Sequence, residues 1–129
     1  MLLSGSLTFS QESYFFERGD TLNITCSVTN AIDWQLLILQ KMAMDGSLVD
    51  IVHVNGSSGL VLLDPTAGYM SEITGILMAD SLLNVWMEDI DCGDESIFVC
   101  SLLVGSVESP VDMIQANTSV QIIGKKPLH

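Results

Sequence analysis

Basic residues are scarce in this chain. It has four Lys and Arg residues against 16 Asp and Glu residues, which gives a net charge of −12 over 129 residues. Nucleic acids are bound through clustered Lys and Arg side chains that neutralise phosphates, and anionic membrane surfaces attract the same side chains. The composition therefore argues against a nucleic-acid partner and against binding to a bare anionic membrane.

Long apolar runs are also missing. Hydrophobic residues make up 48% of the chain, but no uninterrupted stretch approaches the roughly 18 residues that a membrane helix needs. The first six residues are too short, and too poor in basic residues, for a complete signal peptide. Disorder would require low hydrophobicity together with high charge, and this combination is absent. We expect one folded domain at residues 6–124, a tail at 1–5, a linker at 125–129, and no insertion of this segment into a membrane.

Catalytic signatures are lacking as well. The sequence has two histidines, His53 and His129, and no nucleophile elbow, zinc signature or phosphate-binding loop. A catalytic triad forms in space, so spacing alone does not exclude one. A histidine on a strand, such as His53, is nevertheless more often an ordinary surface residue. We predict no enzymatic activity and no cofactor.

Only three cysteines occur, and two of them suggest a disulfide. Cys26 and Cys100 are separated by more than half of the chain, and each lies in a strand-like run. Zinc ligands usually come in close pairs, so this wide spacing favours a bridge that pins two sheets face to face. Closing so long a loop stabilises a protein by about 4.5 kcal/mol in the chain-entropy model, and it implies an oxidising, extracellular setting. The alternative is two buried free thiols in a cytosolic domain.

Turn signals at short spacing separate strand-like runs, which is typical of an all-β sandwich. The expected strands are 6–16, 21–28, 34–40, 48–55, 59–63, 82–87, 96–103 and 117–123, with turns at 19–20, 45–46, 55–56, 64–65 and 92–94. Segment 67–79 stays ambiguous because it has too many Gly and Thr residues for a helix. Alternation predicts that Leu22, Ile24 and Cys26 face inward together. In 96–103 it places Ser96, Phe98 and Leu102 inside with Cys100, and Ile97, Val99, Ser101 and Leu103 outside.

A spaced pattern before Cys100 suggests a family. Counted backwards, it consists of Phe98, Ser96, Asp94, Ile90, Met87 and Val85. The pattern resembles the strand E to strand F signature of the immunoglobulin superfamily, and Leu22-x-Ile24-x-Cys26 is similar to strand B of that family. The resemblance extends from about Leu7 to Ile123. The long interval between the cysteines is similar to the variable type, which has extra strands C′ and C″. It implies an antiparallel two-sheet Greek-key sandwich in a secreted protein or a cell-surface ectodomain.

Phe98, Trp34 and Cys92 depart from the family pattern, and Cys92 has no partner in the sequence and lies in the probable turn between strands E and F. The expected partner of Asp94 is also missing. Phe98 stands where the family has a tyrosine whose hydroxyl bonds back to the chain. Trp34 comes early for the core tryptophan, so Leu36 or Leu37 would fill its pocket if the preceding turn is long, with Trp34 in a loop. The family residue that matches Asp94 pairs with an arginine of strand D, whereas the only arginine here, Arg18, precedes strand B.

The sheet that contains Cys100 carries the more apolar surface. Leu36 to Leu39 follow one another, so either register exposes two of them. We predict a protein-binding face made of Leu37, Leu39, Ile97, Val99, Leu103 and Ile123, since contiguous apolar patches mark interaction sites. The resemblance implies pairing through this sheet, with a protein ligand or a second copy of the chain as the partner. The alternatives are that a neighbouring segment covers these residues or that they belong to a barrel core.

Other features give secondary predictions. Cys92 is either an unpaired thiol or the site of an intermolecular or interdomain bridge. Asn23, Asn55 and Asn117 begin glycosylation motifs. The acidic run from Glu88 to Glu95 could hold calcium, but we favour a solvated turn and predict no metal site.

Two functional readings follow from these observations. The first is an extracellular binding module for protein recognition, cell adhesion or immunity. The second is the immunoglobulin-like arm of a secreted defence lectin that binds pathogens or carbohydrate. It rests on a narrower resemblance, in the Leu-rich strand C and Trp86, to invertebrate defence proteins such as the fibrinogen-related lectins of molluscs.

Overall fold

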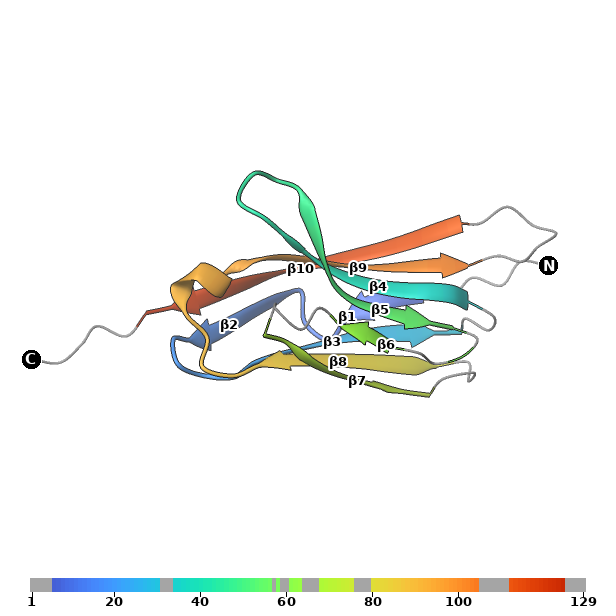
Figure 1. The fold of residues 1–129 in the computed structure, drawn as a ribbon, viewed down its shortest axis with the longest axis horizontal. Helices are drawn as coiled ribbons and strands as arrows, with labels where there is room; N and C mark the ends of the chain where they lie inside the picture. Colours follow the sequence, from blue (N-terminus) through green and yellow to red (C-terminus); the bar gives the residue numbers. More distant parts are fainter. Residues whose placement is uncertain are drawn as a thin grey trace, which may run out of the picture.

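Two β-sheets lie face to face in the computed structural model, which describes residues 6–30, 34–56, 58, 61–63, 68–75, 80–104 and 112–124 (Figure 1). One sheet has four strands in the order β1-β3-β8-β7, and the other has six in the order β2-β10-β9-β4-β5-β6. The elements are β1 (Ser6–Phe9), β2 (Ser13–Glu17), β3 (Leu22–Thr29), β4 (Trp34–Met42), β5 (Leu48–Asn55), β6 (Val61–Leu63), β7 (Met70–Thr74), β8 (Ser81–Met87), the 3-10 helix η1 (Cys92–Asp94), β9 (Ser96–Val104) and β10 (Asp112–Ile123).

The sheet order is that of a variable-type immunoglobulin-like sandwich. β5 and β6 extend the six-stranded sheet beyond β4, where the resemblance placed the extra strands. The pairings of the described strands are antiparallel except for β2 with β10, which run parallel. The predicted fold class is confirmed. No helix in the described part of the chain is long and apolar enough to cross a membrane. Residues 1–5 and 125–129, the expected tail and linker, lie outside the described residues.

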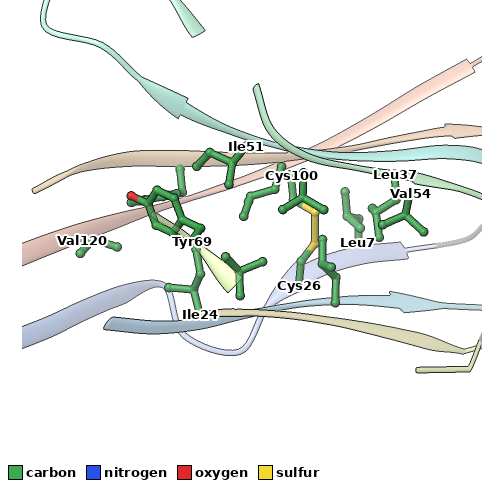
Figure 2. Close-up of a cluster of buried hydrophobic side chains, with 14 of the residues drawn as sticks. Leu7, Ile24, Cys26, Leu37, Ile51, Val54, Tyr69, Cys100 and Val120 are labelled. Carbon is green, nitrogen blue, oxygen red and sulfur yellow. A yellow bond between two sulfur atoms is a disulfide. The ribbon is translucent and has the colours of Figure 1, made fainter. Parts of the chain in front are cut away.

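A disulfide joins the two sheets through their central strands. Cys26 on β3 is bonded to Cys100 on β9, and both side chains are buried. Figure 2 shows the bridge between the layers, with Leu7, Leu37 and Val54 gathered on one side of it. The structure therefore confirms the disulfide between the sheets that the cysteine spacing suggested.

Alternation along β3 and β9 follows the sequence pattern. Leu22, Ile24 and Cys26 are buried on the inner side of β3, and Phe98, Cys100 and Leu102 are fully buried on β9. Ser101 is the exception, because it points outward and is nevertheless buried. Gln115 on the neighbouring strand covers it and donates a hydrogen bond from Nε2 to the Ser101 hydroxyl oxygen at 3.0 Å.

The expected single strand at 6–16 is two strands in different sheets, which corrects the prediction. β1 pairs with β3, whereas β2 pairs with β10 of the opposite sheet. The buried hydroxyl of Thr118 holds the crossover by donating to the carbonyl oxygens of Gln11 and Glu12, at 3.0 and 2.9 Å. Because the chain changes sheets here, β1 is an edge strand of the four-stranded sheet and β2 is an edge strand of the six-stranded sheet.

The other strands agree with the expected ranges except at their ends. β10 begins earlier than expected, and β7 forms within the ambiguous segment 67–79. Residues 59–60 of one expected strand and the turn at 64–65 lie outside the described residues. The 92–94 turn is the helix η1.

Leu37 and Leu39 are buried in the core, so their assignment to the binding face was wrong. They pair with Leu102 and Cys100 of β9, whose side chains point inward, and residues paired across a ladder share a face. Their exposed fractions are 0% and 1%. A register shift between Trp34 and Leu36 brings Trp34 to the inner side as well, at 4% exposure. The outward leucine and isoleucine of β4 are Leu36 and Ile38, which are half-buried.

Trp34 lies at the start of β4 rather than in a loop. It packs against Gly56, where a Cβ atom would approach the Trp34 indole carbon Cε3 to 2.8 Å and its carbonyl oxygen to 1.9 Å. Leu39 is the β4 residue directly opposite Cys100, and Leu37 lies two residues earlier on the same face. These leucines thus occupy the position beside the disulfide.

The hairpin between β4 and β5 stands away from the body of the sandwich (Figure 1). Its turn is closed by Asp45, whose Oδ1 accepts a hydrogen bond from the Ser47 amide at 2.9 Å. Gly46 has a φ of 88°, a conformation that glycine adopts without steric cost. Met42, Ala43 and Met44 of the hairpin line two hollows of the described structure.

Candidate binding face and cleft

The outer side of the six-stranded sheet carries neighbouring apolar side chains from three strands. We call this surface the six-strand face and define it by the outward residues Leu36, Ile38, Ile97, Val99, Leu103 and Met113. Leu36, Leu103 and Met113 form one row across β4, β9 and β10. Ile97 and Met113 are 41% and 57% exposed, and the other four are half-buried. These residues therefore give the face apolar surface that is open to a partner.

The polar side chains on the outer side of the six-stranded sheet are largely uncharged or hydrogen-bonded to one another. Gln40 lies beside Val99 and donates from Nε2 to Asp50 Oδ1 at 2.7 Å. His53 Nε2 lies 2.9 Å from Asp50 Oδ2. The hydrogen bond from Gln40, with a smaller contribution from His53, lowers the pKa of the Asp50 carboxyl below its ordinary value. These bonds hold the polar side chains in place beside the apolar row.

The structure brings together only part of the face that the sequence predicted. Ile97, Val99 and Leu103 point outward as expected. Ile123 is 58% exposed but pairs with Glu17 on β2, beyond the end of β9, so it lies apart from the central rows. Sequence reasoning missed Met113, because the expected strand began at residue 117.

A hollow of about 370 Å³ adjoins the six-strand face beside the projecting hairpin. Ile97, Ser119 and Gln121 line it from the sheet, and Met42 and Met44 line it from the hairpin. The Ser96 hydroxyl donates to the Met42 carbonyl oxygen at 2.6 Å and ties the hairpin to β9. The hollow gives the face a concave end.

The three predicted glycosylation acceptors are all exposed, in different surroundings. Asn23 points outward from the four-stranded sheet, opposite Trp86. Asn55 ends β5, and its Oδ1 accepts a hydrogen bond from the Ser58 amide at 3.0 Å. Ser57, the third residue of that motif, lies outside the described residues. Asn117 pairs with Val99 in the middle of the six-strand face.

The acidic corner between β8 and β9 uses its carboxylates to cap backbone groups. Asp91 caps η1 and forms an ion pair with Arg18, with Nε and Oδ1 3.3 Å apart. Asp94 Oδ2 accepts from the Asp91 amide at 2.8 Å, and Glu95 Oε2 accepts from the Ile122 amide at 2.9 Å. Among the described residues, no group of three or more His, Cys, Asp and Glu side chains is placed to hold a metal ion.

Cys92 is an exposed free thiol at this corner. Its sulfur lies 3.7 Å from the position that a Cβ atom would take at Gly124, just after β10. The thiol is therefore at the end of the sandwich where β10 finishes. Whether it bonds to another chain or domain stays a prediction.

Tyr69 is another site residue that sequence reasoning missed. It precedes β7, packs edge-on against Phe98 with ring centroids 6.2 Å apart, and is 5% exposed. Its buried hydroxyl has no hydrogen-bond partner among the described residues. Burial, and then the nearby negative charge of Asp94, raise the pKa of the Tyr69 phenol well above its ordinary value. Figure 2 shows the hydroxyl pointing away from the disulfide.

A cleft of about 440 Å³ opens beside Tyr69 and Asp94, between the hairpin and the acidic corner. We call it the hairpin cleft. Its walls include the apolar side chains of Met42, Met44, Val49, Ile51 and Met87, and Lys41 also lines it. The segment that contains Tyr69 was ambiguous in sequence, so only the fold shows that this tyrosine meets the hairpin.

Comparisons with solved structures support the fold. A chain from a structure reported as "Structural basis of T cell specificity and activation by the bacterial superantigen toxic shock syndrome toxin-1" superposes with a TM-score of 0.73 at 12% identity, over 93% of this chain and 100% of that one. Murine CRIg gives a TM-score of 0.71 at 11% identity, over 93% of this chain and 98% of that one. No family model and no curated protein matches the sequence.

These likenesses concern the fold alone. Sequence identities of 11 and 12% are too low to carry a ligand or a partner from one chain to another. In all, 1941 solved chains match, so a sandwich of this kind does not select one function. The narrower resemblance to mollusc lectins rests on the sequence alone. The six-strand face and the hairpin cleft are therefore the guides to the function of this chain.

Proposed function

We propose that this chain is a non-enzymatic, extracellular module for protein recognition and that it binds its partner through the six-strand face. The observation that supports this most is the cluster of outward apolar side chains on β4, β9 and β10, of which Ile97 and Met113 are 41% and 57% exposed. Burial of apolar surface is the main driving force of association, at about 25 cal/mol per Å². The disulfide supports the extracellular assignment, because such bonds persist in oxidising compartments.

The partner that we propose first is a second copy of the chain. The resemblance to variable-type domains implies pairing through this sheet. The centre of the face carries Ser101, Gln115 and Asn117 rather than unpaired charges, so two copies would not bury like charges there. The net charge of −12 opposes association at longer range. Salt screens that repulsion, so pairing should strengthen as ionic strength rises.

Sedimentation velocity over a range of protein concentrations tests the proposal. We expect a monomer–dimer equilibrium for the unmodified chain. The dimer should be tighter at 0.5 M than at 0.05 M NaCl, because the screening length falls from roughly 14 Å to roughly 4 Å between these two concentrations. Val99→Asp should abolish the dimer because it places a charge at the centre of the interface. The matched control is Leu82→Asp, since Leu82 is 47% exposed on the opposite sheet. A chain that stays monomeric throughout, or a dimer that is weakened only by Leu82→Asp, would refute it.

A further inference from the structure

The hairpin cleft contains a polar group with an unmet hydrogen-bonding capacity. Only 5% of Tyr69 is exposed, and its hydroxyl has no hydrogen-bond partner within the part of the chain that the structure describes. A buried hydroxyl without a partner costs free energy, so such groups are rare in proteins unless something binds to them. Tyr69 is among the residues that line the cleft. A donor that reaches the buried Tyr69 oxygen from the cleft would supply the missing hydrogen bond.

The charges around the cleft favour a cation. Asp94 lines it, is half-buried, and uses Oδ2 to cap the Asp91 amide. No ion pair to Asp94 is present among the described residues, because the corner's arginine, Arg18, pairs with Asp91. Glu88, Asp89 and Glu95 add negative charge at the same corner. Lys41 also lines the cleft and opposes a cation, but three acidic residues, Asp50, Asp94 and Glu95, line it as well.

The walls set the shape of the group that would fit. Met42, Met44, Ile51 and Met87 provide an apolar lining, and methionine adapts to irregular partners. An arginine side chain has an apolar stem to lie along such walls and a planar guanidinium with five donors. One edge of the guanidinium can donate to the Tyr69 oxygen and another to the Asp94 carboxylate. Lysine has a more strongly hydrated charge and would lose more on entering.

We propose that the hairpin cleft is a second recognition site, which receives an arginine side chain of a protein partner. The guanidinium would lie between the Tyr69 hydroxyl and Asp94, with its stem against the methionines. This site shares Met42, Ala43, Met44 and Glu95 with the hollow beside the six-strand face, but its other lining residues, which include Tyr69 and Asp94, do not line that hollow. The proposal does not depend on pairing through the six-strand face.

The test is NMR titration of the isotope-labelled chain with the peptide acetyl-Gly-Arg-Gly-amide. We expect saturable shifts at the amides of Tyr69, Gly93 and Asp94. The same peptide with citrulline in place of arginine is the control, because citrulline keeps the shape and removes the charge. We expect about tenfold weaker binding of the citrulline peptide, the loss of one charged hydrogen bond.

Three variants sharpen the result. Tyr69→Phe removes only the unpartnered hydroxyl and should weaken the arginine peptide several-fold. Asp94→Asn keeps an acceptor for the Asp91 amide and should weaken it about tenfold. Lys41→Gln should strengthen binding, because it removes the opposing charge. Val99→Asp should leave the titration unchanged, which separates this site from the six-strand face.

Several outcomes would overturn the proposal. Equal binding of the arginine and citrulline peptides would show that the charge is not recognised. Shifts outside the cleft, or no saturable shift at all, would show that the cleft is not the site. Weaker binding of the arginine peptide to the Lys41→Gln variant would contradict the proposed electrostatics of the cleft. Circular dichroism of each variant establishes that it is folded before titration.

Discussion

The two outer surfaces of the sandwich differ in chemistry although one core supports both. The four-stranded sheet presents mainly Asn, Thr and Ser side chains outward, and Thr25 donates to Asn84 across it at 3.1 Å. Leu82 stands among these polar neighbours, whereas the other two large apolar groups of this sheet, Trp86 and Met70, pair with each other. The six-stranded sheet instead has an apolar row across three strands, formed by Leu36, Leu103 and Met113. Continuity of apolar surface across several strands, more than the number of apolar groups, distinguishes the proposed docking surface from the opposite sheet.

Removal of the disulfide should have the largest effect, because the bridge holds the sheets that carry both surfaces. Cys100→Ser removes the disulfide between two residues that are 74 positions apart in sequence. We expect a loss of about 2–5 kcal/mol in the free energy of unfolding. Urea denaturation measures the loss. An unchanged midpoint would show that the bridge adds nothing to the pairing of the sheets.

The next test contrasts the inner and outer sides of β4. Leu37→Ala should cost about 2–5 kcal/mol because Leu37 is fully buried beside the disulfide. Leu36→Ala should cost less than about 1 kcal/mol, since Leu36 is half-buried on the outer side. Thermal melting of the pair measures both. Equal losses would contradict the register of β4, and with it the composition of the six-strand face.

The register of β4 also shows where sequence reasoning reaches its limit. β3 and β9 alternate between apolar and polar residues or carry a cysteine that fixes the inner side, so their faces were predictable. Leu36 to Leu39 are all apolar, and periodicity cannot orient such a run. The division of residues 6–16 into two strands depends on Thr118, more than 100 residues away in sequence, which binds the Gln11 and Glu12 carbonyls. Tyr69 became a site residue only through its tertiary neighbours.

A glycan should affect the two surfaces differently. Asn117 lies opposite Val99 at the centre of the six-strand face, whereas Asn23 lies on the four-stranded sheet. If chains from a glycosylating host carry sugar at Asn117, Asn117→Gln should increase dimer formation severalfold, because a bulky glycan excludes a partner. Asn23→Gln should leave the dimer unchanged. Peptide mass spectrometry gives the occupancy, and sedimentation gives the association. A dimer that forms equally well with sugar at Asn117 would place the interface elsewhere.

The smallest expected effect concerns Tyr69 and alkaline pH. An unfolded tyrosine ionises near pH 10, but burial and Asp94 raise the pKa of folded Tyr69. The neutral phenol thus contributes its full stability below pH 10, and that contribution falls as pH rises above 10. Tyr69→Phe should change the free energy of unfolding by less than about 1 kcal/mol at pH 7. Above pH 10, the free energy of unfolding of this variant should fall less than that of the unmodified chain. Urea midpoints from pH 7 to 11 measure the difference, and parallel curves would contradict it.

The central claim is that the six-strand face, and not the opposite sheet, is the docking surface. The most direct test is a dilution series of a methyl-labelled chain followed by NMR. We predict that the methyl signals of Ile38, Ile97 and Val99 move with protein concentration while those of Leu82 stay fixed. Movement of the Leu82 signals alone, or fixed signals for all of these residues, would contradict the account.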